Sequence, residues 1–279
     1  MGAVSEPLIQ WFELNRRLLP FRQEPSAYHI WVSEIMLQQT RVAAAIPYYE
    51  RFIAALPDPA ALAACEPDAL RKLWQGLGYY NRVNNMQKAA RIVCEQYGGD
   101  LPADYEALRG LPGIGDYTAG AVASIAFGIP VPAVDGNVLR ILSRFTGSDL
   151  DILDAKNRKI FRTWAAAALP AERPGAFNQA LMDLGSAVCL PGPSPRCGDC
   201  PLAHLCAARQ EGKQAMLPVR TPKREKRREE MTVFLLRRTD GAVALCRRPQ
   251  RGLLAGLWEY PNIPGLLTDH NTDRCRGVY

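Results

Sequence analysis

No stretch of this sequence is apolar enough to span a membrane, and that absence is the first constraint on its class. The hydrophobic runs are short and interrupted by charges, whereas a membrane-spanning helix needs about 20 consecutive apolar residues. The N-terminus also lacks the basic, apolar and small-residue order of a secretory signal peptide. We therefore expect a cytoplasmic protein that does not contact membranes.

The sequence also lacks a chain-wide excess of charge. The formal net charge is +6 at pH 7, but residues 220–251 alone hold eleven Lys or Arg against four Asp or Glu. Because the rest of the chain is close to neutral, the net charge is weak support for nucleic-acid binding. A local basic run is usually a solvated linker, although it can also contact a polyanion.

A disulfide framework is not expected either, because the chain has no secretory signal. Four of the eight Cys nevertheless fall within 18 residues, at Cys189, Cys197, Cys200 and Cys206. Zinc is the generic ligand of such a cluster, but zinc sites usually have two short Cys pairs and this cluster has one. The uneven spacing therefore favours an iron–sulfur cluster held by four thiolates. His204 is a competing ligand, although a solvated loop histidine is the simpler interpretation.

The length of 279 residues and the hydrophobic content of 48% allow one large domain or two ordinary ones. Apolar periodicity predicts a first helix over 7–19, which Pro20 ends, and a loop at 19–22. Further helices are predicted over 30–47, 58–65, 67–77, 84–97, 104–110 and 117–127. The tail differs, because it predicts strands over 231–237 and 242–246, which are too few to close a sheet core.

The sequence is organised around a tight turn, Leu111-Pro112-Gly113-Ile114-Gly115, between two predicted helices. Pro112 stops the first helix, and the two glycines permit a sharp reversal. The second helix then begins with unpaired N–H groups and the positive end of its dipole, which is a ready site for a phosphate. An ordinary helix–turn–helix corner with a glycine cap is the alternative interpretation.

Glu34, Gln38 and Arg41 form a polar stripe on the otherwise apolar helix predicted over 30–47. The stripe is structural if it faces solvent. If Trp31 and Leu37 instead enclose Glu34, burial raises the pKa of its carboxyl, which then serves as a general acid near neutral pH.

Asp135 follows an extended, Pro-rich segment and stands where a helix N-cap belongs. A carboxylate at a helix start has a lowered pKa and stays ionised, which suits it to stabilise a developing cation. The alternative is a purely structural cap. Tyr79 and Tyr80 lie beside glycines at 76–78, where they either fill a core or wedge between bases.

Jointly, these stretches resemble the MutY family of adenine DNA glycosylases, within the helix-hairpin-helix, endonuclease III-like superfamily. The resemblance covers roughly residues 7–265. Its carriers are the stretches 33–40, 76–80, 111–115, 134–138, 177–185 and 252–258 together with the four clustered Cys.

The resemblance implies a mostly α fold, a two-lobed helix-hairpin-helix DNA glycosylase with an iron–sulfur cluster loop and a partial MutT-like β segment. The implied domains are a catalytic domain over 1–219, a basic linker over 220–230 and an incomplete MutT-like domain over 231–279. Within the catalytic domain, a six-helix lobe spans about 25–130, and a cluster lobe combines the N-terminal helix with about 131–219.

Matched residue by residue, the resemblance makes Glu34 the acid that protonates adenine N7 and Asp135 the anion that stabilises an oxocarbenium-like sugar. Tyr117 and Asn137 support them. The resemblance also implies that Arg22, Leu37 and Asp183 line a pocket for the extruded adenine. Gln38 and Tyr79 are the residues that wedge into the duplex. Gly113 and Gly115 contact a DNA phosphate. The cofactor is a 4Fe–4S cluster on Cys189, Cys197, Cys200 and Cys206.

These roles agree with the chemistry. Adenine is a poor leaving group and needs a proton, while the sugar becomes electron-deficient and needs an anion, much as in glycoside hydrolysis. The target base must also leave the stack, which costs least at a mispair. We expect a monomer that acts at the bacterial nucleoid on duplex DNA with adenine opposite 8-oxoguanine or guanine.

Tyr117 separates this activity from that of related bifunctional enzymes, which place a nucleophilic lysine at the second position after the hairpin. Tyrosine cannot form a Schiff base, so the resemblance implies base removal without strand cleavage. An endonuclease III-like glycosylase/lyase for oxidised pyrimidines is the alternative enzyme, and a non-catalytic DNA-binding module is the alternative outside enzymes.

The sequence departs from the family pattern at several positions. The first Cys gap has seven residues where the family usually has six, Phe21 replaces a Trp, and Asp183 replaces a Glu. The MutT-like part, which reads oxidised guanine in the family, covers only about fifty residues and has no phosphohydrolase signature. We expect adenine excision to persist and the preference for 8-oxoguanine over guanine to be weaker.

Overall fold

The computed structural model describes residues 2–23, 25–221, 228–249 and 251–266. The chain divides into two compact units, with the boundary after Thr221. Most of the predicted basic linker and the final residues of the chain lie outside the described residues. Within the described part, no helix combines the length and the apolar character needed to cross a membrane.

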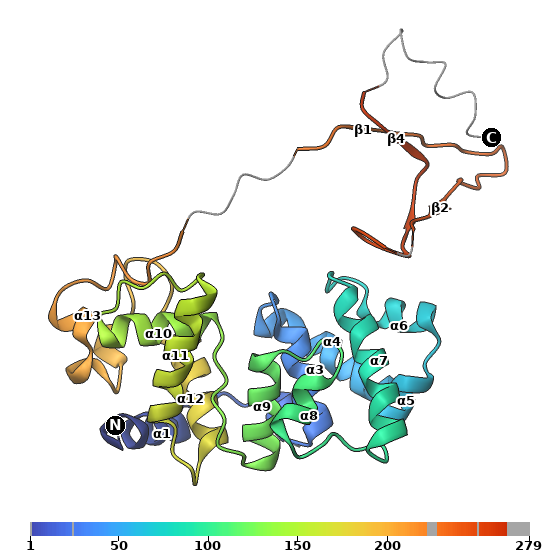
Figure 1. Ribbon diagram of the computed structural model, residues 1–279. Coiled ribbons are helices and arrows are strands. Elements are labelled where there is room, and N and C mark those ends of the chain that lie inside the picture. Colours follow the sequence, from blue (N-terminus) through green and yellow to red (C-terminus); the bar gives the residue numbers. More distant parts are fainter. Residues whose placement is uncertain (1, 24, 222–227, 250, 267–279) are drawn as a thin grey trace. The chain divides into compact units, whose positions relative to one another are not determined.

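The first unit is entirely helical (Figure 1). Its earlier helices are α1 (Gly2–Asn15), α2 (Pro20–Gln23), α3 (Ala27–Leu37), α4 (Val42–Ala55), α5 (Pro59–Ala64), α6 (Pro67–Trp74), α7 (Asn81–Gln96), α8 (Tyr105–Gly110) and α9 (Asp116–Phe127). Its later helices are α10 (Gly136–Thr146), α11 (Ala155–Ala168), α12 (Pro174–Ala187) and α13 (Ala207–Gln210), with short 3-10 turns at Cys197–Asp199 and Ala203–Leu205.

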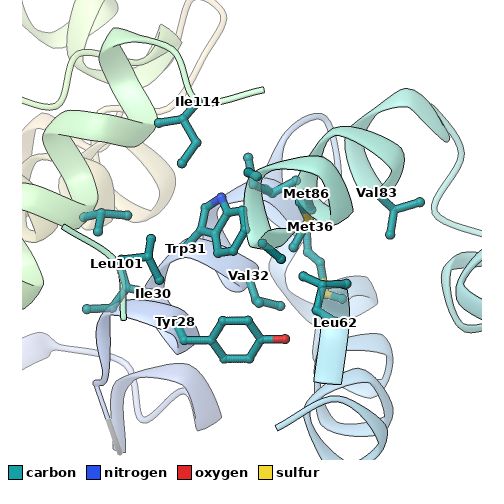
Figure 2. Packing of buried hydrophobic residues seen from close by; sticks show 14 of the residues in the cluster. Tyr28, Ile30, Trp31, Val32, Met36, Leu62, Val83, Met86, Leu101 and Ile114 are labelled. Carbon is teal, nitrogen blue, oxygen red and sulfur yellow. The ribbon is translucent and has the colours of Figure 1, made fainter. Parts of the chain in front are cut away.

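Two separate hydrophobic cores divide this unit into two lobes. Helices α2–α9 enclose the first core, which we call the hairpin lobe, and Trp31 is fully buried near its centre (Figure 2). The N-terminal helix α1 packs with α10–α12 around the second core, and we call this part of the unit the cysteine lobe. Helices α9 and α12 pack against each other where the two lobes meet.

Proline and acidic caps set several helix starts in the hairpin lobe. Pro59 and Pro67 occupy the first helical position of α5 and α6, where a missing N–H group costs nothing. The carboxylate of Asp58 accepts a hydrogen bond from Ala61 N at 2.7 Å, and that of Asp104 caps α8 in the same way. These local signals agree with the helices predicted over 58–65, 67–77 and 104–110.

Two of the predicted helices have the wrong boundaries. The helix predicted over 7–19 ends at Asn15, and Pro20 opens the short helix α2 within the predicted loop 19–22, since Pro is compatible with the first turn. The helix predicted over 30–47 ends at Leu37, and a new helix begins at Val42. The polar stripe of Glu34, Gln38 and Arg41 therefore does not lie on one helix face.

The second unit contains four short strands, β1 (Met231–Val233), β2 (Cys246–Arg247), β3 (Trp258–Glu259) and β4 (Asn262–Pro264). They form two antiparallel pairs, β1 with β4 and β2 with β3. The predicted strands 231–237 and 242–246 meet at a single bridge, between Arg237 and Val243. The longer predicted strands are wrong, because later segments supply the main pairing partners.

Candidate active site

The carboxyl of Glu34 is enclosed by the hairpin lobe. Helix α3 is buried on nearly every face, and Glu34 itself is only 8% exposed. Tyr117, in the first turn of α9, donates its hydroxyl to Glu34 Oε2 at 2.5 Å. Burial, followed by the charge of Asp135, raises the pKa of Glu34 to about 7, against the lowering effects of the Tyr117 hydrogen bond and of Arg22. The predicted direction of the pKa shift is correct.

Asp135 is the N-cap of α10, as its position in the sequence predicts. Its Oδ1 accepts the backbone N–H of Val138 at 2.8 Å, and its Oδ2 accepts Asn137 Nδ2 at 2.8 Å. The predicted lowering of its pKa is wrong, because burial raises the pKa of Asp135 and outweighs the hydrogen bonds that lower it. The charge of Asp135 is one of the causes that raise the pKa of Glu34, so the two carboxyls lie in one electrostatic site.

Asn137 is held by Arg140, a buried residue that sequence reasoning missed. Arg140 Nη2 donates to Asn137 Oδ1 at 2.9 Å and to the carbonyl of Gly185 at 2.7 Å, while its Nε donates to the carbonyl of Cys189 at 2.9 Å. Gly185 leaves room for this contact, because a Cβ there would lie 2.6 Å from Asn137 Cβ. Arg140 thus joins the Asp135 side of the site to the start of the cysteine loop.

Asn178 on α12 holds the extended segment that immediately precedes Asp135. Its Oδ1 accepts the backbone N–H of Ala133 at 3.1 Å, and its Nδ2 donates to Val131 O at 2.9 Å and to Ser124 Oγ at 2.8 Å. A buried amide with three partners is well satisfied and defines the path of the chain. Asn178 lies in the stretch 177–185, one of those that carry the family resemblance.

Asp183 on α12 pairs with two arginines that come from the N-terminal side of the hairpin lobe. Arg22 Nη1 lies 2.7 Å from Asp183 Oδ2, and Arg17 Nη2 lies 2.5 Å from Asp183 Oδ1. The Asp183 side chain is only 3% exposed, so the carboxylate is held in a paired, largely dry position. Arg17 was missed by sequence reasoning. Leu37, the last residue of α3, is half-buried against the hairpin-lobe core.

The side chains of Gln38 and Tyr79, the two predicted wedge residues, differ in their exposure to solvent. Gln38 is half-buried, and its Nε2 lies 3.4 Å from Thr118 Oγ1 on α9. The neighbouring Gln39 is exposed and has a φ of 62°. Tyr79 is 63% exposed with a φ of 46°. Gln39 and Tyr79 are therefore exposed residues with positive φ, whereas the Gln38 side chain lies against α9.

The predicted turn joins α8 to α9, and the structure explains its glycine at position 113. Gly113 has a φ of 80°, and a Cβ there would approach Asn85 Cβ to 2.8 Å. Gly115 is the N-cap of α9 in an extended conformation. Next to it, Asp116 pairs with Arg109 at 2.8 Å and with Arg162 at 2.9 Å. Arg162 belongs to α11, so this ion pair connects the two lobes.

The four clustered cysteines line one cavity in the cysteine lobe, and none of them forms a disulfide. The rest of the lining includes Ile141, Leu184, Val188 and Leu202, so the walls are largely apolar. Arg144 Nη1 donates to Cys189 Sγ at 3.4 Å and also binds the carbonyl of Leu190. Within the described residues, no group of His, Cys, Asp and Glu is gathered closely enough for one metal ion. His204 is exposed on the loop.

The site thus combines a glycine-containing turn at the start of α9 with two carboxyls, buried Glu34 and half-buried Asp135, in a two-lobed helical unit. Residues 32–166 match the family model described as HhH-GPD superfamily base excision DNA repair protein. Among solved structures, a thermostable thymine-DNA glycosylase is 27% identical, with a TM-score of 0.68 over 75% of this chain and 96% of that chain.

Curated relatives identify the family within this class. The adenine DNA glycosylase of Schizosaccharomyces pombe is 34% identical over 317 residues, covering 92% of this chain and 68% of the relative. That of Rattus norvegicus is 36% identical over 312 residues, covering 94% of this chain and 60% of the relative. The chain belongs to the adenine DNA glycosylase family, as its motifs predict, and it spans about 60% of the length of its mammalian relatives.

Proposed function

We propose that this chain removes adenine from duplex DNA by hydrolysing its N-glycosidic bond, opposite 8-oxoguanine or guanine, without cleaving the strand. The observation that carries the proposal is the pair of carboxyls, buried Glu34 and half-buried Asp135, which the two lobes bring into one electrostatic site. Membership of the adenine DNA glycosylase family supports the choice of base.

In the proposed reaction, Glu34 donates a proton to N7 of the extruded adenine. A pKa of about 7 keeps a large fraction of this carboxyl protonated at neutral pH, so the acid form is available without a large penalty. The Tyr117 hydroxyl donates to one oxygen of Glu34, which leaves the other oxygen to carry the proton toward the base. Burial also raises the pKa of Tyr117 well above its ordinary value, so it remains a donor.

As the bond to adenine breaks, the sugar becomes positively charged, and Asp135 is the group that stabilises this charge. Its two hydrogen bonds, from Val138 N and Asn137 Nδ2, fix the carboxylate before the reaction begins. Such preorganisation is effective because nothing has to reorient in the transition state. Water then adds to the sugar and leaves an abasic site.

The remaining roles concern binding. We propose that Arg17, Arg22 and Asp183 line the pocket for the flipped adenine, with Leu37 as an apolar wall. Gly113 and Gly115 present backbone N–H groups of the hairpin and α9 to a DNA phosphate. The geometry favours Gln39 over Gln38 as the partner of Tyr79 in the duplex, because Gln38 is turned toward Thr118.

The cavity lined by Cys189, Cys197, Cys200 and Cys206 fits a 4Fe–4S cluster. Four free thiols around an apolar cavity are the donor set that such a cluster requires, and the Arg144 guanidinium beside Cys189 offsets the charge of its thiolate. When bound, the cluster supplies four iron–thiolate bonds that cross-link the loop. The monomeric state and the cytoplasmic location remain predictions.

Single-turnover excision on a duplex with one A:8-oxoguanine pair tests the proposal, with and without alkali. Strand cleavage that appears only after alkali supports a monofunctional glycosylase. Cleavage without alkali points to a lyase, and DNA binding without cleavage in either condition points to a binding module. A matched A:G duplex tests whether this chain discriminates the two mispairs.

A further inference from the structure

Two loops of the hairpin lobe, one between α3 and α4 and one between α6 and α7, each contain an exposed residue with an unusual backbone conformation. Gln39 has a φ of 62° and Tyr79 a φ of 46°, and the described residues contain only one other non-glycine residue with positive φ, Leu254. Such conformations are disfavoured for side chains of this size. They persist only where neighbouring contacts hold the backbone in place.

One side chain, Arg82 in the first turn of α7, contacts both loops. Its Nη1 donates to the carbonyls of Ile35 and Gln38 at 2.8 and 2.6 Å, where α3 ends. Its Nη2 donates to the carbonyls of Leu77 and Gly78 at 2.9 and 3.3 Å, within the second loop. The two groups of carbonyls are thus joined through a single planar guanidinium.

The same guanidinium also lies against aromatic rings that flank the second loop. Its centre is 5.8 Å from the Tyr79 ring centroid and 5.2 Å from that of Trp74. Arginine presents five donors in a fixed planar fork, so it can serve two loops at once while stacking on a ring. A lysine ammonium is compact and cannot span the same set of carbonyls.

These contacts account for the break between α3 and α4. The last carbonyls of a helix need donors from elsewhere, and Arg82 supplies them at Ile35 and Gln38. The chain then turns through Gln39 rather than continuing as a helix. Arg82 thus binds the carbonyls that immediately precede Gln39 and Tyr79, those of Gln38 and Gly78.

We propose that Arg82 is a positioning residue that holds Gln39 and Tyr79 as one preformed double wedge for opening the base pair. The inference rests on the proposed function, since it assigns the wedge to adenine extrusion. Arg82 itself need not touch the extruded base. Its effect is transmitted through the two loops, so its loss lowers extrusion and leaves the chemistry of Glu34 and Asp135 in place.

Two readouts test this role. The first is the fluorescence of 2-aminopurine opposite 8-oxoguanine, which rises when the base leaves the stack, measured in a Glu34→Gln background that keeps the base attached. The second is single-turnover excision of adenine. We expect Arg82→Met and Arg82→Lys both to lose most of the fluorescence rise and to slow excision by at least about tenfold.

A double-mutant cycle distinguishes positioning from general destabilisation. If Arg82 acts through the wedge, Arg82→Met changes excision by less than about twofold in a Gln39→Ala/Tyr79→Ala background. Equal losses in both backgrounds, or full activity of Arg82→Lys, would overturn the inference. If Arg82→Met does not fold, the same cycle is run with Arg82→Lys.

Arg71→Met is the matched control, because Arg71 is a half-buried arginine of the same lobe that pairs with Asp68 on its own helix at 2.7 Å. It should keep both the fluorescence rise and the excision rate. Failure of the proposed function is recognised separately, since the wild-type chain itself would then not excise adenine. Excision by wild type with no effect of Arg82 substitutions would contradict only the positioning role.

Discussion

The hairpin lobe contributes a buried carboxyl, Glu34, and the cysteine lobe a half-buried one, Asp135, and the two lobes hold these groups by different means. Glu34 lies in the last turn of α3, a helix buried on nearly every face, and its hydrogen-bond donor is the Tyr117 hydroxyl. Asp135 comes from a helix start, where the backbone N–H of Val138 and the amide of Asn137 donate to it. Burial raises the pKa of both carboxyls, but only that of Asp135 is opposed by backbone hydrogen bonds.

The difference shows how one functional group acquires two roles. A carboxyl inside a helix has no free backbone N–H groups near it, so desolvation controls its protonation. A carboxyl at a helix start is placed beside free N–H groups and the positive end of the dipole. The first arrangement suits an acid and the second suits an anion, which agrees with the proposed division of labour.

Removing either carboxyl should have the largest effect. Asp135→Asn keeps a side-chain acceptor for Val138 N but loses the negative charge, so we expect single-turnover adenine excision to fall by about 10²–10³-fold. Glu34→Gln should cost about 10²–10⁴-fold through loss of the acid. Circular dichroism confirms folding of both variants. If Asp135→Asn kept the wild-type rate, the proposed stabilisation of the positively charged sugar by Asp135 would be contradicted.

The pKa of Glu34 also predicts how stability depends on pH. Because its folded pKa of about 7 exceeds its ordinary value of 4.5, the stability that this group contributes is fully present below about pH 4.5. It is lost as the pH rises through 7. Between pH 5 and pH 9, the free energy of unfolding should fall by up to about 3 kcal/mol more in wild type than in Glu34→Gln. Urea titrations at both pH values measure the difference, and identical pH dependences would show that Glu34 is not desolvated.

Arg140→Leu tests whether adenine excision depends on the hydrogen bonds by which Arg140 holds Asn137, the residue that donates to Asp135. The substitution leaves the carbonyls of Gly185 and Cys189 without their donor and releases Asn137. We expect excision to slow by about tenfold and the unfolding free energy to fall by about 1–3 kcal/mol. Arg158→Leu changes an exposed arginine in the first turn of α11, so it is a suitable control and should leave the excision rate near that of wild type. If the unfolding free energy fell and the excision rate did not, Arg140 would contribute to folding alone and not to the site.

Tyr117→Phe should have the smallest effect on the maximal rate. The hydroxyl lowers the pKa of Glu34 by donating to its ionised form, so its removal raises that pKa further. The midpoint of the pH–rate profile should therefore move to higher pH, with only a few-fold change in the rate at low pH. An unchanged midpoint would mean that this hydrogen bond does not act on the ionised carboxyl.

Much of the hairpin lobe could be predicted because its signals are local. Prolines at helix starts, acidic caps and the glycines of the turn act within a few residues. The same holds in the cysteine lobe for Asp135, whose immediate neighbours indicate a cap. The break after Leu37 was not predictable, since the donor that permits it, Arg82, lies 44 residues from Gln38 in the chain. The pKa of Asp135 was missed because burial depends on packing that periodicity does not reveal.

The same distinction applies to the residues that support the site. Glu34, Tyr117 and Asn137 can be assigned roles from their motifs, whereas the contacts of Arg17, Arg140 and Asn178 are with residues far away in the sequence. In the second unit, alternation of apolar residues indicated strands. It could not show that β1 pairs with β4 rather than with its nearest neighbour.

The pH dependence of single-turnover excision tests the central claim most directly, with wild type and Glu34→Gln compared on the same A:8-oxoguanine duplex. If burial tunes Glu34 to act as the acid, the wild-type rate is high below pH 7 and declines as the pH rises through about 7. The residual rate of Glu34→Gln should lack that transition. A wild-type profile that stays flat between pH 5 and 9, or an unchanged transition in Glu34→Gln, would contradict the assignment.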